Sequence, residues 1–173
     1  HYRLYTAEYA GYWKGLRWEA AYMADDNFQI DVKDHSHLWG WYAQAGWLLF
    51  GGRQRYDSNG AKFTRVQRGK KWGDIELCGR YEYIDFNGLL SGPVGAAEAW
   101  TVGLNFYVNN HVKFVVNYQY NNNDRYATGK GNKFYVGYDA NNNPTKDYTK
   151  VVAPDGKAGV DYSMLGVRME IDF

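Results

Sequence analysis

The sequence contains little cysteine, little proline and no long apolar run. A single cysteine, Cys78, among 173 residues excludes an internal disulfide framework and most thiolate metal sites. The longest stretch without a charged residue, Leu38 to Gly52, is interrupted by polar side chains and is too short for a membrane-spanning helix. Positive and negative charges nearly cancel, with 20 Lys and Arg against 19 Asp and Glu, which argues against a nucleic-acid partner.

Aromatic residues and glycine, in contrast, are abundant. The chain contains 17 Tyr, 7 Trp and 8 Phe, together 18% of the residues, and 20 Gly but only 3 Pro. This aromatic content, together with the β-branched residues, excludes an intrinsically disordered chain. Tyr and Trp favour the boundary between an apolar and an aqueous phase, where each part of the side chain meets a suitable environment.

Apolar and polar residues alternate with a period of two along most of the chain. In residues 165–173 every second residue is apolar, and the residues between them include Arg168, Glu170 and Asp172. This period predicts β-strands with one apolar and one polar face. Seven strands are predicted, at residues 2–13, 15–24, 38–50, 72–86, 97–108, 110–122 and 160–173.

The predicted connections differ in length on the two sides of the sheet. Short turns at Trp13 to Gly15 and at Asn109-Asn110 lie on one side, and long polar loops near 25–37, 87–96 and 123–159 lie on the other. This layout is typical of an outer-membrane β-barrel, with short periplasmic turns and long outer loops. One connection, 51–71, is long although its position places it on the side of the short turns. A soluble β-sandwich is the alternative, but its strands rarely run past ten residues.

Seven strands do not close a bacterial single-chain barrel, which needs an even number of about eight or more. An open sheet would also leave unpaired backbone groups in lipid. We therefore expect residues 1–173 to be the C-terminal portion of a larger transmembrane antiparallel β-barrel, truncated at the N-terminus. At the observed spacing of strands, a barrel of roughly 16 strands needs about 400 residues.

Three stretches of the chain carry specific motifs. Tyr5-Thr-Ala-Glu-Tyr-Ala-Gly-Tyr and Leu16-Arg-Trp-Glu-Ala-Ala-Tyr-Met flank a short turn and place Glu8 and Glu19 in adjacent strands. The second stretch is Gly40-Trp-Tyr-Ala-Gln-Ala-Gly-Trp-Leu-Leu, followed by Arg55-Tyr-Asp and Lys62-Phe-Thr-Arg-Val. The third is Ile75-Glu-Leu-Cys-Gly-Arg-Tyr-Glu-Tyr-Ile-Asp with Thr101-Val-Gly-Leu-Asn-Phe-Tyr-Val-Asn-Asn-His-Val-Lys, and the chain ends on Gly166-Val-Arg-Met-Glu-Ile-Asp-Phe. Together these motifs resemble the C-terminal part of the phosphate-selective porin O and P family.

The resemblance implies a porin in the outer membrane of a Gram-negative bacterium. Such a protein would pass small hydrophilic solutes by passive diffusion, with a preference for anions or phosphate, and would need no cofactor. It would contact membrane lipid and lipopolysaccharide and assemble as a homotrimer. The phosphate-coordinating residues of the family lie mostly in its N-terminal half, so none is carried over to this chain.

Two alternatives from other functional classes remain open. The first is a structural β-barrel subunit of an outer-membrane complex, in which loop 123–159 holds a protein partner. The second is a soluble carbohydrate-binding β-module that uses its aromatic residues.

The polar face of the predicted strands holds the candidate pore-lining residues, which are Glu8, Arg17, Glu19, Asp74, Glu76, Arg80, Glu82, Lys113, Asn117, Arg168 and Glu170. Connection 51–71 carries seven bases against Asp57 alone. We expect it to fold into the lumen, held by the acids Asp74, Glu76 and Glu82 and by the apolar anchors Phe63 and Val66. Its candidate anion-attracting residues are Arg53, Arg55, Arg65 and Arg68.

No catalytic motif stands out, and an enzyme is not expected. Ser36 lies between His35 and His37, but neighbouring residues of a strand point to opposite faces, so the three do not form a catalytic group. The two histidines would share a face and could bind a metal, although a solvated loop end is favoured. The side-chain oxygens of the Asn and Asp residues in 121–124 and 139–143 suit Ca²⁺, but turn formation explains these clusters more simply.

The terminal Phe173 resembles the signal read during barrel assembly.

Overall fold

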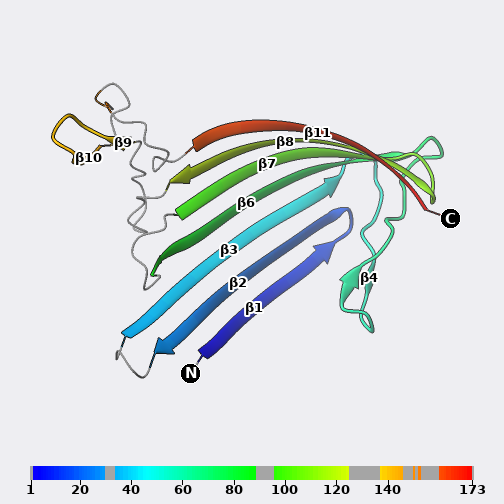
Figure 1. The fold of residues 1–173 in the computed structure, drawn as a ribbon. Coiled ribbons are helices and arrows are strands. Elements are labelled where there is room, and N and C mark those ends of the chain that lie inside the picture. Colours follow the sequence, from blue (N-terminus) through cyan, green and yellow to red (C-terminus); the bar gives the residue numbers. More distant parts are fainter. Residues whose placement is uncertain are drawn as a thin grey trace.

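The computed structural model describes residues 2–29, 34–88, 96–124, 137–145, 150, 152 and 160–172. Within them, seven long antiparallel strands form one curved sheet (Figure 1), and the seven predicted strands are confirmed. The strands are β1 (Tyr2–Trp13), β2 (Leu16–Gln29), β3 (Asp34–Leu48), β6 (Asp74–Gly88), β7 (Ala96–Tyr107), β8 (Val112–Asp124) and β11 (Val160–Ile171). They lie side by side in chain order, β1-β2-β3-β6-β7-β8-β11.

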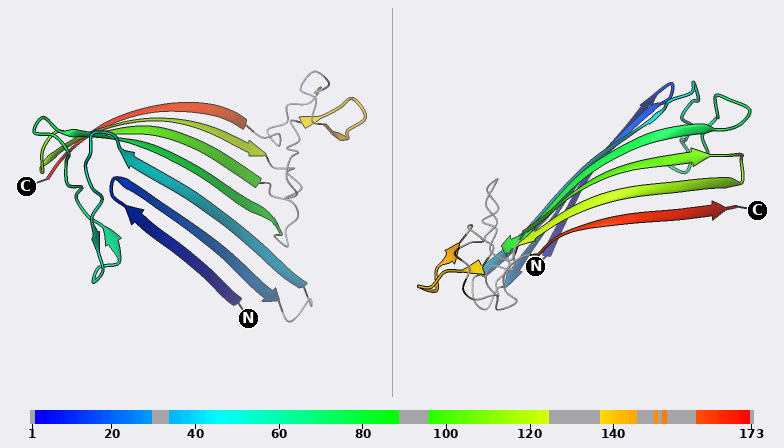
Figure 2. Two further views of the ribbon diagram at one scale, coloured as in Figure 1. Left: turned by 180° about the vertical axis from the view of Figure 1, so that it is seen from behind. Right: turned by 90° about the horizontal axis from the view of Figure 1, so that it is seen from above.

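The sheet is a single concave layer with two open edges, β1 and β11 (Figure 2). The β1–β2 turn has only two residues, because Trp13 pairs with Leu16, and Lys14 adopts a left-handed φ of 54° to close it. This turn, the β7–β8 turn, connection 51–71 and the C-terminus lie at the same end of the sheet, here called the turn end (Figure 1). The opposite end is called the loop end.

Strands β2 and β3 run further toward the loop end than the alternation predicts. They pair as far as Gln29 and Asp34, so residues 25–29 and 34–37 of the expected loop 25–37 belong to strands. That loop was predicted because residues 25–37 are mostly polar and have a low strand propensity. Backbone pairing overrides this propensity, and the side chains add to it, since Asp26 Oδ1 lies 2.5 Å from His37 Nδ1.

The other two long loops lie largely outside the described residues, as does Phe173. Within 123–159, strands β9 (Gly137–Tyr138) and β10 (Pro144–Thr145) form a small hairpin. Its turn is closed by Asp139 Oδ1, which accepts the backbone N–H groups of Asn141 and Asn143. Residues 121–124, also considered as a turn, instead continue β8.

The two faces of the sheet differ in chemistry. One row of apolar side chains crosses all seven strands in register and is exposed: Trp13, Leu16, Trp47, Leu77, Leu104, Val116 and Val167. A single-layer sheet buries no such row against a second layer, so the solvent for this apolar face is lipid. Among the described residues, no helix is long and apolar enough to cross a membrane.

Opposite faces of one strand should therefore react with different reagents. Cysteine at Val116 or Val167, which are exposed on the apolar face, should react with lipid-soluble but not with water-soluble maleimides. Cysteine at Asn117 or Arg168, one residue away on each strand, should show the reverse pattern. Labelling of the protein in membranes measures this, and equal labelling of neighbouring positions would refute the assignment of the two faces.

Candidate functional site

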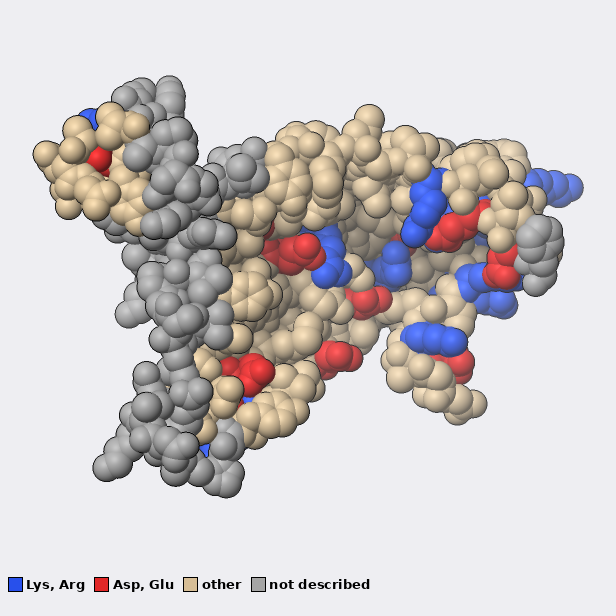
Figure 3. Space-filling view, in the orientation of Figure 1, with Lys and Arg blue, Asp and Glu red and all other residues tan. Residues whose placement is uncertain are grey.

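All eleven candidate pore-lining residues lie on the same face of the sheet. Cross-strand partners share a face, and the partners run in continuous rows, such as Asp74 to Tyr107 to Lys113 to Glu170. The acidic and basic side chains gather on the hollowed side of the molecule (Figure 3). This charged surface is called the polar face below.

Glu76, on β6, is the centre of the polar face at the turn end. Its side chain is completely buried, with 0% exposed. Its carboxylate accepts hydrogen bonds from Arg17 Nε at 2.8 Å, Gln54 Nε2 at 2.9 Å, Asn105 Nδ2 at 2.9 Å and the Tyr107 hydroxyl at 2.7 Å. A buried charge is tolerated only when its partners replace water, and here four donors do so.

The contact between Arg17 and Glu76 passes over strand β3, which lies between their strands. Gly46 on β3 makes this possible. A Cβ atom at Gly46 would lie 2.9 Å from Glu76 Cδ and 3.1 Å from Arg17 Nε, closer than ordinary packing allows. Because Gly46 has no side chain, the Arg17 and Glu76 side chains can meet above β3. This gap above Gly46 is called the passage over β3 below.

Asp74 fixes both ends of connection 51–71. Its carboxylate, which is completely buried, accepts backbone N–H groups from Phe50 at 3.1 Å and Gly69 at 2.7 Å. Phe50 immediately precedes the connection and Gly69 lies near its end, so a single side chain draws its entry and exit together. At the entry, Gln54 N donates to the Lys14 carbonyl at 2.8 Å, which ties the connection to the β1–β2 turn as well.

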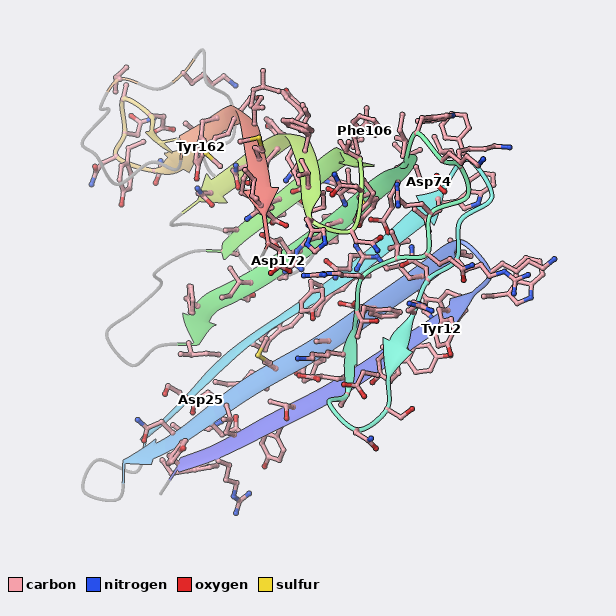
Figure 4. All side chains as sticks on the ribbon, turned by 90° about the vertical axis from the view of Figure 1, so that its right-hand side faces the viewer. Tyr12, Asp25, Asp74, Phe106, Tyr162 and Asp172 are labelled. Atoms are coloured by element: carbon pink, nitrogen blue, oxygen red, sulfur yellow. The ribbon has the colours of Figure 1, made fainter. Side chains whose placement is uncertain are left out.

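Connection 51–71 lies across the polar face at the turn end (Figure 4). It contains a short hairpin, β4 (Tyr56–Asp57) and β5 (Lys62–Phe63), and Tyr12 of β1 packs against Tyr56 and Phe63 with ring centroids 6.2 and 6.1 Å away. At the other side of the sheet, Arg65 forms an ion pair with Asp172, beyond the end of β11. The connection thus reaches from one edge strand to the other.

The arginines of the connection have partners other than those expected. Arg65 is paired with Asp172, and Arg68 donates to the Val108 carbonyl at 2.8 Å. Within the described residues, the side chains of Arg53 and Arg55 form no ion pair. The expectation that Asp74, Glu76 and Glu82 hold these bases is wrong, because the three acids bind backbone amides, Arg17 and Arg80 respectively.

Further from the turn end, the polar face carries a chain of hydrogen bonds across β2, β3 and β6. Gln44 Nε2 donates to Glu19 at 2.5 Å, and Arg80 Nη1 donates to the Gln44 carbonyl oxygen at 2.9 Å. The Arg80 guanidinium also lies 3.9 Å from the centre of the Tyr42 ring and pairs with Glu82. These side chains neutralise one another and stiffen the wall.

Strands β8 and β11 carry a second charged group. Glu170 pairs with both Lys113 and Arg168, each at 2.6 Å. A hollow of about 340 Å³ lies between these strands and β2, β3 and β6, lined by four bases: Arg17, Arg80, Lys113 and Arg168. Asn117 lines the same hollow, and the exposed Glu8 lies near the open β1 edge.

Sequence reasoning missed the neutral partners Gln44, Gln54, Asn105 and Tyr107. Alternation places Gln44, Asn105 and Tyr107 on the polar face, but the candidates selected from that face were all charged residues except Asn117. Gln54 lies outside any long strand, so no pattern identifies it. His35 and His37 both approach Asp26, at 3.9 and 2.5 Å, yet no three potential ligands in the described parts of the chain are placed to hold a metal ion.

Comparison with known proteins agrees with this geometry. Residues 1–138 match the family described as phosphate-selective porin O and P. Porin O of Pseudomonas aeruginosa is 34% identical over 117 residues, which cover 62% of this chain and 26% of that protein. The chain therefore spans about a quarter of the length of this relative. With its antiparallel sheet, apolar outer row and charged inner face, the chain belongs to the phosphate-selective porin O and P family, a family of outer-membrane β-barrel channels of Gram-negative bacteria rather than enzymes.

Proposed function

We propose that this chain forms part of the wall of a porin through which small hydrophilic solutes diffuse passively, with a preference for anions such as phosphate. The observation that carries this proposal is the basic connection 51–71 lying across the charged, concave face. A solute that follows the polar face to the turn end would pass this connection. Membership of a family described as phosphate-selective supports phosphate as the anion.

The charge balance of the polar face explains the preference. The bases on the strands are largely matched by nearby acids, as in the pairs of Arg17 with Glu76 and Lys113 with Glu170. Connection 51–71 adds seven bases and a single acid, and only Arg65 among them has an acidic partner in the described residues. Unmatched positive charge in a confined aqueous space raises the local concentration of anions.

Arg53 and Arg55 are the residues best suited to meet a passing phosphate. Both are exposed, and a free guanidinium offers two parallel N–H groups to two phosphate oxygens.

We also propose, from family membership, that the protein contacts membrane lipid and lipopolysaccharide and assembles as a homotrimer. A protein partner at the long outer loops remains a separate proposal.

Replacing both Arg53 and Arg55 by glutamine should shift the reversal potential in a salt gradient toward cation selectivity. The ratio of anion to cation permeability should fall about two- to fivefold, since each lost charge is worth about 1 kcal/mol at close range in water before screening. Planar-bilayer recordings of the full-length protein measure this change.

The control is the pair Arg65→Gln and Arg68→Gln. These two arginines are already bound to Asp172 and to the Val108 carbonyl, so their loss should shift selectivity less. If the double variant with Arg53→Gln and Arg55→Gln keeps the anion selectivity of the wild type, the proposed role of these arginines in the anion preference is contradicted. A full-length protein that is silent in bilayers would contradict the porin function itself and favour the structural subunit.

A further inference from the structure

Toward the loop end, the polar face becomes apolar. Leu4, Met23, Ile84 and Phe86 are exposed there and line a hollow of about 510 Å³, here called the apolar hollow. Met23, Gly40 and Ile84 are cross-strand partners and form one row of its wall. Exposed apolar side chains that gather in a hollow of a water-filled wall indicate a surface that binds a solute.

Gly40 keeps the centre of this row free of any side chain. A Cβ atom at Gly40 would lie 2.9 Å from the Tyr83 carbonyl oxygen and 3.3 Å from Ile84 Cγ1, so the position admits only glycine. The backbone of Gly40 is therefore open between Met23 and Ile84. Glycine within a strand allows a ligand to approach the backbone closely, and a methionine makes favourable contacts with an aromatic ring.

Arg80 joins the apolar hollow to the hollow of about 340 Å³ described above, here called the basic hollow, because it lines both. Its guanidinium lies 3.9 Å from the centre of the Tyr42 ring. Nη1 donates to Gln44 Oε1 at 2.9 Å, and Nε pairs with Glu82. These contacts use Nε and Nη1 and leave the N–H groups of Nη2 for a ligand.

The charges around the two hollows would orient a ligand that has one anionic end. The basic hollow is lined by four bases and, among the described residues, by a single acid, Glu19. Three acids belong to the wall of the apolar hollow. Glu82 is paired with Arg80, Glu98 has its side chain on the opposite face, and Asp25 lies at the loop end. An anionic group is therefore attracted toward Arg80 and repelled from Asp25.

We propose that the two hollows together bind aromatic monoesters of phosphate. The phosphate accepts hydrogen bonds from Arg80 Nη2 at the edge of the basic hollow. The aromatic ring lies in the apolar hollow, over Gly40 and between Met23 and Ile84. This inference rests on the proposed function, because it names an organic class among the anions that follow the polar face.

The dimensions of the wall suit a single ring. The Arg80 guanidinium lies over Tyr42, and Gly40 is two residues further along β3 toward the loop end. Two residues of a strand span roughly 7 Å. A phosphate that is joined to one aromatic ring through its ester oxygen has about this length, so both ends of the ligand reach their partners at once.

Isothermal titration calorimetry of the purified full-length protein with phenyl phosphate and with methyl phosphate tests this site. The two esters carry the same anionic group and differ in the ring. Phenyl phosphate should bind about tenfold more tightly, since its ring leaves water for the apolar hollow and keeps one side exposed. Equal affinities would overturn the proposal.

The apolar contribution is isolated by the double variant Met23→Gln with Ile84→Thr, which removes apolar contacts while keeping side-chain length or β-branching. Its affinity for phenyl phosphate should fall about tenfold, to that for methyl phosphate, which should not change. Met164→Gln is the matched control. Met164 lies on the polar face in the cross-strand row of Arg80 and is 46% exposed against 48% for Met23, and this described residue is outside the lining of both hollows. An equal loss in the control would overturn the proposal.

The anionic contribution is isolated by Arg80→Gln. Its affinities for both esters should fall by the same factor, about tenfold, the value of one charge-assisted hydrogen bond. Unchanged affinities would contradict the placement of the phosphate. Planar-bilayer recordings separate this site from the proposed function: a silent channel would refute the porin, whereas an anion-selective channel that binds both esters equally would refute only the aromatic site.

Discussion

Valine in place of Gly46 should lower the free energy of unfolding by about 3–5 kcal/mol, the cost of breaking a buried ion pair from one side. The valine side chain would occupy the passage over β3 and push the Glu76 carboxylate away from the Arg17 guanidinium. Glu76 is completely buried, so it would then hold an unmatched charge away from water. Urea unfolding of the purified protein, followed by tryptophan fluorescence, measures the loss.

Gly166→Val is the matched control for this change. Gly166 belongs to the same cross-strand row on the polar face, but a Cβ atom there would have nothing within 4 Å. Its replacement should shift the unfolding midpoint little, apart from the general gain in strand propensity over glycine. Similar midpoints for the two variants would show that the passage over β3 does not hold the sheet together.

Replacing Glu76 by glutamine should release connection 51–71 from the sheet. The neutral amide no longer balances Arg17, and it weakens the hydrogen bond from Gln54, which anchors the start of the connection. Hydrogen bonds to charged groups contribute about 1.5–3 kcal/mol, so local opening should become roughly ten- to a hundredfold more frequent. Trypsin should therefore cut the connection faster by a similar factor, because the segment is rich in arginine and lysine.

Glu82→Gln serves as the comparison, since Glu82 is partly exposed and pairs with Arg80 on the strand itself. The rate of tryptic cleavage should remain close to that of the wild type in this variant. Single-channel conductance provides a second readout, because a released connection would obstruct the lumen differently. If Glu76→Gln and Glu82→Gln are cleaved equally fast, the buried cluster is not the anchor of the connection.

The alternation of residues predicted the strands and their faces because both depend only on local geometry. Successive side chains of a strand point to opposite sides, so Val167 and Arg168 could be assigned to their faces from the sequence alone. The strand ends near Asp25 and Asp26 could not, since pairing with a neighbouring strand overrides the low strand propensity of these residues.

The partners of the charged residues could not be predicted for a different reason. Arg65 pairs with Asp172, 107 positions away in the sequence, and Arg17 meets Glu76 across an intervening strand. Such contacts depend on curvature, on a glycine at one position and on the path of a connection that has no periodic pattern. The acids nearest in sequence to the basic segment were therefore the wrong choice of partners.

The carboxylate of Asp74 draws Phe50 and Gly69 together, so the residues between them form a closed loop with a fixed base. The tip of this loop, Ser58 to Gly60, is exposed, and its turn is set by local contacts such as the one from Asn59 N to Asp57 Oδ1 at 3.0 Å. A change in the length of the tip would thus leave the base in place. The segment is a natural insertion point for engineering: a ligand-binding peptide grafted at the tip would be presented on the inner side of the wall, where its occupancy could be recorded electrically as a sensor signal.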